Sequence, residues 1–99
     1  MHEYYKIKSV LSPILEAAGY LENSENNNAD CYGSISTHYQ SGNEWARTGW
    51  DGIGGYGYAS LLGGNGWQDL DTKVFESNDR EFENAASSLS AELQRSLKQ

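Results

Sequence analysis

The stretch YASLLGGNGWQDL at residues 58–70 decides the fold class of this chain. Its two halves carry apolar and aromatic residues, and they flank the turn sequence Gly63-Gly64-Asn65-Gly66. Asn-Gly between two such segments is a strong signal for a β-hairpin. We therefore predict an antiparallel sheet that includes residues 58–62 and 67–75.

The segment before this hairpin also has strand character. Between residues 31 and 39, alternate positions carry Cys31, Gly33, Ile35, Thr37 and Tyr39, and this two-residue period is typical of a strand with one covered face. Residues 41–44 supply turn chemistry that leads into residues 45–50. Residues 49–58 hold too much glycine for a helix and predict a bulged strand or a loop. Together these segments predict a three-stranded antiparallel meander.

A helix is predicted at the N-terminus, because apolar residues recur there at spacings of three and four. Gly19 is a suitable C-terminal cap. Pro13 removes a hydrogen bond inside a helix, so we expect a kink or break near Ser12. The apolar positions are Tyr4, Ile7, Val10, Leu11, Ile14, Leu15 and Ala18.

A second helix is predicted at the C-terminus. Ser77 or Asn78 can cap it, and Glu81 follows Asn78 at the spacing of a capping box. Its apolar stripe consists of Phe82, Ala85, Ala86, Leu89, Leu93 and Leu97. We therefore expect one α+β domain over residues 1–99, in the order helix, meander, helix, with both helices on one face of the sheet. The polar residues 22–30 are expected to form a mobile connection.

The formal charge is concentrated in the middle of the chain. The net charge is −7, and residues 20–79 account for all of it with nine acidic residues against Arg47 and Lys73. The same segment holds all three tryptophans and every glycine except Gly19. Such a surface attracts basic partners and repels nucleic acid and anionic lipid.

The other motifs carry little chemistry. Residues 52–57 match the glycine pattern G-x-G-x-x-G, but a dinucleotide site needs that pattern between a strand and a helix, and here a predicted strand follows it. Asp69 and Asp71 share one strand face and favour a solvated acidic surface over a weak cation site. Cys31 and His38 lie on opposite faces of the predicted strand, which argues against a catalytic pair. Zinc would need more ligands than these and His2 provide.

Composition narrows the class of protein further. One cysteine cannot form an internal disulfide, no apolar run at the N-terminus resembles a secretion signal, and no stretch reaches the roughly 20 apolar residues that span a bilayer. We expect a cytoplasmic protein without a membrane role, with no metal or other cofactor and no enzymatic activity.

The leading hypothesis is a small acidic protein-binding module, an inhibitor or nucleic-acid decoy that docks on a basic, nucleic-acid-handling protein. Small inhibitors encoded by phages and mobile elements, such as anti-defence proteins, often have this general character. Aromatic and acidic residues are interspersed in the central segment. Aromatic side chains anchor interfaces, and acidic side chains steer the approach of a basic partner. The expected partner-binding residues are Glu44, Trp45, Trp50, Asp51, Tyr56, Tyr58, Trp67, Asp69 and Asp71.

Two alternatives remain open at this stage. The exposed aromatic sheet face would also suit a structural subunit that forms a homodimer or joins a larger assembly. A pocket at the glycine-rich segment would suit an enzyme or small-ligand binder, and it would require convergent polar groups.

Overall fold

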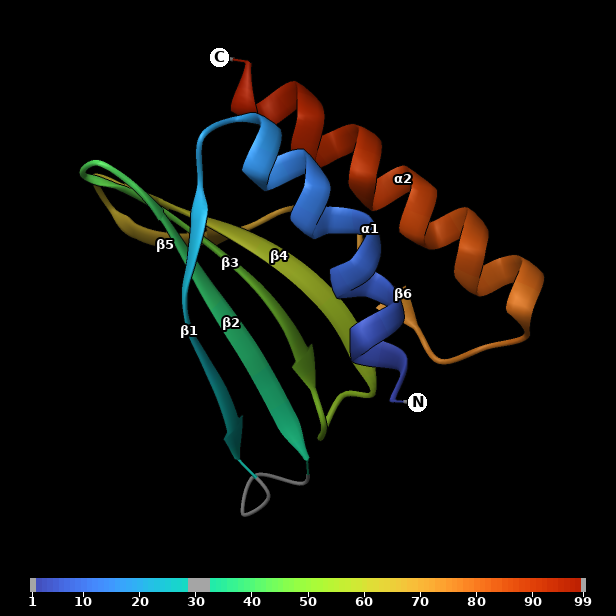
Figure 1. Ribbon diagram of the computed structural model, residues 1–99. Helices are drawn as coiled ribbons and strands as arrows, with labels where there is room; N and C mark the ends of the chain where they lie inside the picture. Colours follow the sequence, from blue (N-terminus) through green and yellow to red (C-terminus); the bar gives the residue numbers. More distant parts are fainter. Residues whose placement is uncertain (1, 29–32, 99) are drawn as a thin grey trace.

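The computed structural model describes residues 2–28 and 33–98. Two helices, α1 (Glu3–Ala17) and α2 (Asp79–Leu97), enclose six strands along the chain (Figure 1). The α+β class is confirmed, but the predicted count of three strands is wrong. The strands are β1 (Leu21–Asn28), β2 (Ser34–Ser41), β3 (Glu44–Asp51), β4 (Tyr56–Gly63), β5 (Gly66–Asp69) and β6 (Val74–Phe75).

The strands form one antiparallel sheet in which β1 to β5 lie side by side in chain order. Its order is β1-β2-β3-β4-β5, and β6 also pairs with β4. The predicted hairpin is confirmed, with Leu62 opposite Trp67 and Gly63 opposite Gly66. The glycine-rich segment divides between two structures, since β3 ends at Asp51, a turn follows, and β4 begins at Tyr56.

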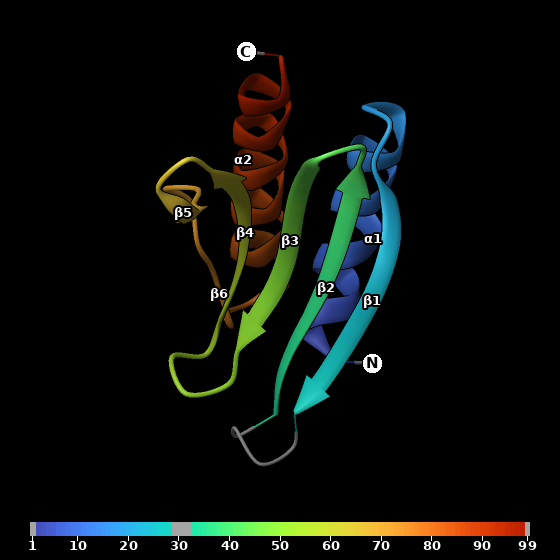
Figure 2. The ribbon, with the colours of Figure 1, turned by 90° about the vertical axis from the view of Figure 1, so that its left-hand side faces the viewer.

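The helices and the sheet form two layers. Figure 1 shows α1 and α2 side by side on one side of the sheet, and Figure 2 shows the strands from the other side with the helices behind them. Helix α1 contacts β3 and β4, and α2 contacts β4 and β6. We call the sheet surface turned away from the helices the open face.

The core lies between these two layers. Ile35, Thr37 and Tyr39 of β2 are buried on the helix side, as their alternation predicts. Tyr4, Ile7, Leu11 and Leu15 of α1 meet them, together with Phe82, Ala86, Leu89 and Leu93 of α2. Cys31, predicted to begin this strand, lies outside the described residues.

Helix α1 continues through Pro13, so the predicted break near Ser12 is not present. Pro13 is exposed, and the carbonyl that it leaves without an intrahelical partner belongs to Ser9, which is exposed as well. Water can satisfy that carbonyl, so the cost of the proline is reduced. Ser12 and Tyr39 are joined by a hydrogen bond between their hydroxyls, which ties this turn of the helix to β2.

The segment predicted as a connection is a strand over most of its length. Residues 22–28 belong to the edge strand β1, whereas residues 29 and 30 lie outside the described residues. Strand β1 is rich in polar residues and is exposed to solvent. Ion pairs, rather than apolar contacts, connect it to α1. Lys8 of α1 reaches Glu22 at 3.0 Å and Glu25 at 2.8 Å.

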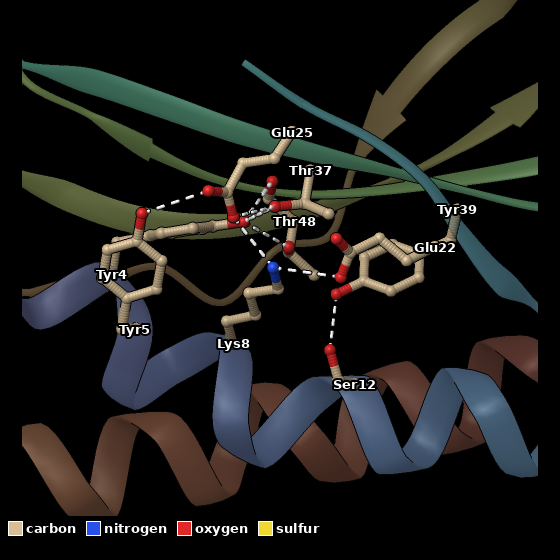
Figure 3. Close-up of polar contacts among 9 residues, drawn as sticks. All are labelled: Tyr4, Tyr5, Lys8, Ser12, Glu22, Glu25, Thr37, Tyr39 and Thr48. Atoms are coloured by element: carbon tan, nitrogen blue, oxygen red, sulfur yellow. Dashed lines mark hydrogen bonds and ion pairs between the residues drawn. The ribbon is translucent and has the colours of Figure 1, made fainter. Parts of the chain in front are cut away.

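A chain of hydroxyl groups extends this network into the core (Figure 3). Thr37 donates to the Glu25 carboxylate at 3.1 Å, so its Oγ1 must accept the hydrogen bond from Tyr4. The Tyr4 oxygen can then accept from Thr48, whose Oγ1 lies 3.0 Å away. Tyr4, Thr37 and Thr48 are fully buried, and burial raises the pKa of Tyr4 to about 12. This network fixes α1 on the sheet.

Helix α2 is fixed by its N-cap and by one carboxylate. The predicted cap is confirmed, because the Asn78 side chain accepts from the Glu81 amide at 2.9 Å. Further along, Glu92 accepts from the amides of Asp71 and Thr72 at 2.7 and 2.8 Å. These two bonds hold the segment between β5 and β6 against α2.

Candidate functional site

The open face is built from alternate residues of the five main strands. Thr37, Thr48 and Ala59 point to the helices, so their neighbours along each strand point the other way. The register then aligns one polar row across the sheet. It runs Ser24, His38, Arg47, Ser60 and Asp69, one residue from each strand.

Arg47 is the centre of this surface. Its guanidinium lies 4.6 Å from the ring centre of Trp67 and 5.5 Å from that of Tyr58. Its Nη2 is 3.3 Å from the Ser60 hydroxyl and 3.7 Å from the Asp69 carboxylate. Two rings and one carboxylate therefore hold the cation in place, and a guanidinium suits such a setting because it can stack and bond at once.

Residues around Arg47 complete a connected cluster. The Ser60 hydroxyl donates to Asp69, and Lys73 lies 3.7 Å from the same carboxylate. The rings of His38 and Trp67 meet edge to face at 5.6 Å. Burial, together with the charge of Arg47, lowers the pKa of His38, so this imidazole is neutral at pH 7.

A hollow of about 450 Å³ opens beside this cluster. It lies along β3 and β4, with Arg47 and Asp69 towards one end and Asp51 and Ile53 towards the other. Tyr56 and Tyr58 of β4 line it between those ends, and Asn26, Ser34, Ile35, Ser36 and Trp50 complete the lining. The volume is in the range of ligand-sized pockets, about 300–1,000 Å³.

The glycine at position 49 shapes this hollow. A Cβ added to Gly49 would lie 2.4 Å from the Cζ and the hydroxyl of Tyr58. The Tyr58 ring therefore lies directly over the backbone of β3, which only a glycine permits. Burial raises the pKa of Tyr58, so the phenol remains protonated at neutral pH.

Five of the nine predicted partner-binding residues come together on this face. Tyr58, Trp67 and Asp69 contact Arg47. Tyr56 joins them through an edge-to-face contact with Tyr58 at 6.2 Å, and it also lies under Lys73 at 5.3 Å. Asp51 lies at the far end of the hollow, opposite Tyr56 in the β3-β4 register.

The prediction that Trp50 is an exposed anchor is wrong, because its side chain belongs to the core. It is 5% exposed, and it follows Gly49 on the strand and so points to the helices. Gly57 lies opposite Trp50 in the register, and the Ile7 side chain and the Trp50 ring pack against its bare backbone. A buried ring of this kind cannot be an exposed anchor.

The other three predicted residues lie outside the hollow. Trp45 is partly exposed near Leu62, at the end of the sheet where β3 begins. Glu44 precedes it and accepts a hydrogen bond from Tyr20 at 3.0 Å. Asp71 follows β5, in the segment that Glu92 holds against α2.

Sequence reasoning missed Arg47, His38, Ser60 and Lys73 as members of this surface. A signal for Arg47 exists in the sequence, since it is the only arginine of the acidic segment and lies between two tryptophans. The contacts also change the charge expected there. Arg47 and Lys73 both form ion pairs with Asp69, so this part of the face carries less negative charge than the composition of the segment suggests.

Within residues 2–28 and 33–98, no three His, Cys, Asp or Glu side chains are placed to share a metal ion. In the same part of the chain, neither helix has the length and hydropathy needed to cross a bilayer.

Comparison with known proteins gives no match. No family model, no curated protein and no solved structure is significantly similar to this chain.

Proposed function

We propose that the chain is a protein-binding module that docks on a basic partner through the open face of its sheet. The observation that supports this proposal is the position of Tyr56, Tyr58 and Trp67, which are partly exposed on the open face. Tyrosine, tryptophan and arginine are the residues that most often dominate binding energy at interfaces. Arg47 supplies the third of these residue types in the same cluster.

The rings are preorganised for docking. Contacts among Arg47, Tyr58 and Trp67 restrict their rotamers, so little side-chain entropy is lost when a partner covers them. The net charge of −7 supplies long-range attraction to a basic partner, and such attraction raises association rates. Charge therefore steers the encounter, and the aromatic cluster holds the complex.

An inhibitor or decoy of a nucleic-acid-handling protein fits this division of roles. The surfaces of such proteins are basic, and an acidic chain that covers one competes with nucleic acid. Direct binding of nucleic acid by this chain is disfavoured by its charge.

The test is capture by the immobilised wild-type protein, compared with Trp67→Ala and Val10→Ala. Val10 lies on α1, on the opposite side of the molecule, and is 42% exposed, so it is a control for truncation of an exposed apolar side chain. Proteins retained by the wild type and by Val10→Ala but lost with Trp67→Ala are partners of the open face. Equal retention by all three proteins would contradict docking through this surface.

The captured partner then tests the role of charge. Association rates measured at about 50 mM and about 500 mM salt should fall markedly with salt, since screening weakens steering at a Debye length of a few ångströms. Trp67→Ala should instead raise the dissociation rate. Association that does not depend on salt would remove the steering role.

Self-association is the second candidate, favoured by the exposed Leu62 beside Trp67. Leu62 is 41% exposed, and together with Trp67 it extends the aromatic surface towards Trp45. Sedimentation at micromolar concentration distinguishes the two functions. A symmetric dimer that Trp67→Ala dissociates would favour assembly over docking on a foreign partner.

A further inference from the structure

The two ends of the hollow on the open face differ in charge. At one end, Asp69 already has two cations, Arg47 and Lys73, each at 3.7 Å. At the other end, no lysine or arginine among the described residues forms an ion pair with Asp51. Asp51 lies four residues from Arg47 along β3, about 13 Å of extended chain. The carboxylate of Asp51 is therefore not neutralised by the lysines and arginines of the described residues.

Asp51 is also held rigidly in its ionised form. One oxygen of its carboxylate accepts from the amides of Ile53 and Gly54, both at 2.9 Å. These bonds, that from Gly54 first, lower the pKa of Asp51. The Tyr56 hydroxyl also donates to this carboxylate. A carboxylate has roughly four acceptor sites, so it can still accept a hydrogen bond from a ligand. The turn after β3 thus fixes a charged acceptor at the rim of the hollow.

Aromatic and apolar groups surround this acceptor. Tyr56 lies opposite Asp51 in the register, and Tyr58 follows on the same face of β4. Both rings already lie near cations of the chain, Tyr56 near Lys73 and Tyr58 near Arg47. Ile53 lies on the rim and is 74% exposed, a position suited to contact with aliphatic methylenes.

We propose that the Asp51 end of the hollow binds an arginine side chain of the partner protein. The guanidinium donates to Asp51, its plane stacks on the tyrosine rings, and its methylenes lie against Ile53. Arginine fits better than lysine because its planar fork matches a carboxylate and stacks on aromatic faces. This inference rests on the proposed function and names the chemical group that the open face recognises.

The experiment is an NMR titration of the full chain with three small probes. N-acetyl-arginine amide is the ligand probe, N-acetyl-lysine amide tests the choice of cation, and N-acetyl-citrulline amide has the shape of the arginine probe without its charge. We expect saturable shifts with arginine at the amides of Ile53 and Gly54, which report directly on Asp51. Lysine should give smaller shifts, and citrulline almost none.

Asp51→Asn is the decisive variant, because an asparagine oxygen can still accept from both turn amides while the charge is lost. It should weaken binding of the arginine probe by about threefold to tenfold. Glu83→Gln, at an exposed position of α2, makes the same change of net charge and should leave the affinity unchanged. Equal binding by Asp51→Asn and wild type, or equal shifts with citrulline and arginine, would overturn the proposal.

Failure of this inference and failure of the proposed function give different results. If partner capture depends on Trp67 but not on Asp51, the open face docks a partner and the arginine site is wrong. If capture is independent of Trp67 as well, docking through the open face is itself wrong.

Discussion

Tyr4 of α1 and Thr48 of β3 meet at the centre of the helix-sheet interface, with their side-chain oxygens 3.0 Å apart. Both residues are fully buried. The hydrogen bond between them is one step of a chain that ends at the carboxylate of Glu25. A polar chain of this kind stabilises the fold only while each of its members keeps a partner.

Tyr4→Phe should therefore lower the free energy of unfolding by about 1–3 kcal/mol, because the hydroxyls of Thr37 and Thr48 lose a buried partner. The measurement is urea denaturation followed by circular dichroism. Tyr5→Phe is the control, since its hydroxyl bonds to Glu25 at the exposed edge of the same network. Its cost should remain below about 1 kcal/mol. If both variants lost the same free energy of unfolding, burial of the hydroxyl chain would not determine how much it stabilises the fold.

Acid should destabilise the protein partly through Glu25. Its hydrogen bond from Lys8 lowers the pKa of this carboxyl in the folded state. The stabilisation is therefore complete above the unfolded-state pKa of about 4.3 and is lost as pH falls through the lower folded-state pKa. Thermal melts between pH 6 and pH 3 measure this loss. The difference in Tm between wild type and Glu25→Gln should become smaller as the pH falls. A difference that stays constant over this range would contradict the assignment.

Gly57→Ala should destabilise the core. An added Cβ would lie 2.1 Å from the Cδ1 of Ile7, so this fully buried side chain would have to shift within the core. Overpacking of this kind costs about 1–3 kcal/mol. Gly64→Ala, where nothing lies within 4 Å of an added Cβ, is the control and should change stability by less than about 0.5 kcal/mol. Chemical denaturation of both variants measures the contrast.

Glu92→Ala should loosen the segment between β5 and β6 without unfolding the domain. Two amides, those of Asp71 and Thr72, lose their acceptor. Hydrogen exchange should accelerate at these amides and remain unchanged at the centre of β3. Glu83→Ala, on an exposed part of α2, should change neither region. Unchanged protection at Asp71 and Thr72 in Glu92→Ala would show that other groups hold the segment.

Several elements could be predicted because local chemistry decides them. The Asn-Gly hairpin, the Asn78 cap and the alternation of Ile35, Thr37 and Tyr39 are each fixed by residues close in sequence. Strand β1 could not be predicted in this way. Its residues are typical of a loop, and the strand depends on contacts distant in sequence, namely its pairing with β2 and the ion pairs of Glu22 and Glu25 with Lys8 on α1.

The candidate site also combines features that local sequence predicts with features that depend on contacts between distant residues. Alternation along the strands could have separated Trp50 from Asp51, but the register of β3 with β4 and β5 was needed to bring Arg47, Ser60 and Asp69 into one row. Composition indicated an acidic aromatic segment. It could not indicate that Arg47 and Lys73 neutralise part of that charge, because the pairing depends on which side chains share a face.

The strand order has a consequence for how the chain reaches this structure. Each hairpin from β1 to β5 joins segments that are adjacent in sequence, so little loop-closure entropy opposes its formation. The contact of α1 with α2, by contrast, joins the two ends of the chain. Folding kinetics should accordingly show the meander assembled early and helix docking late, with substitutions at the contact between the helices acting mainly on the unfolding rate.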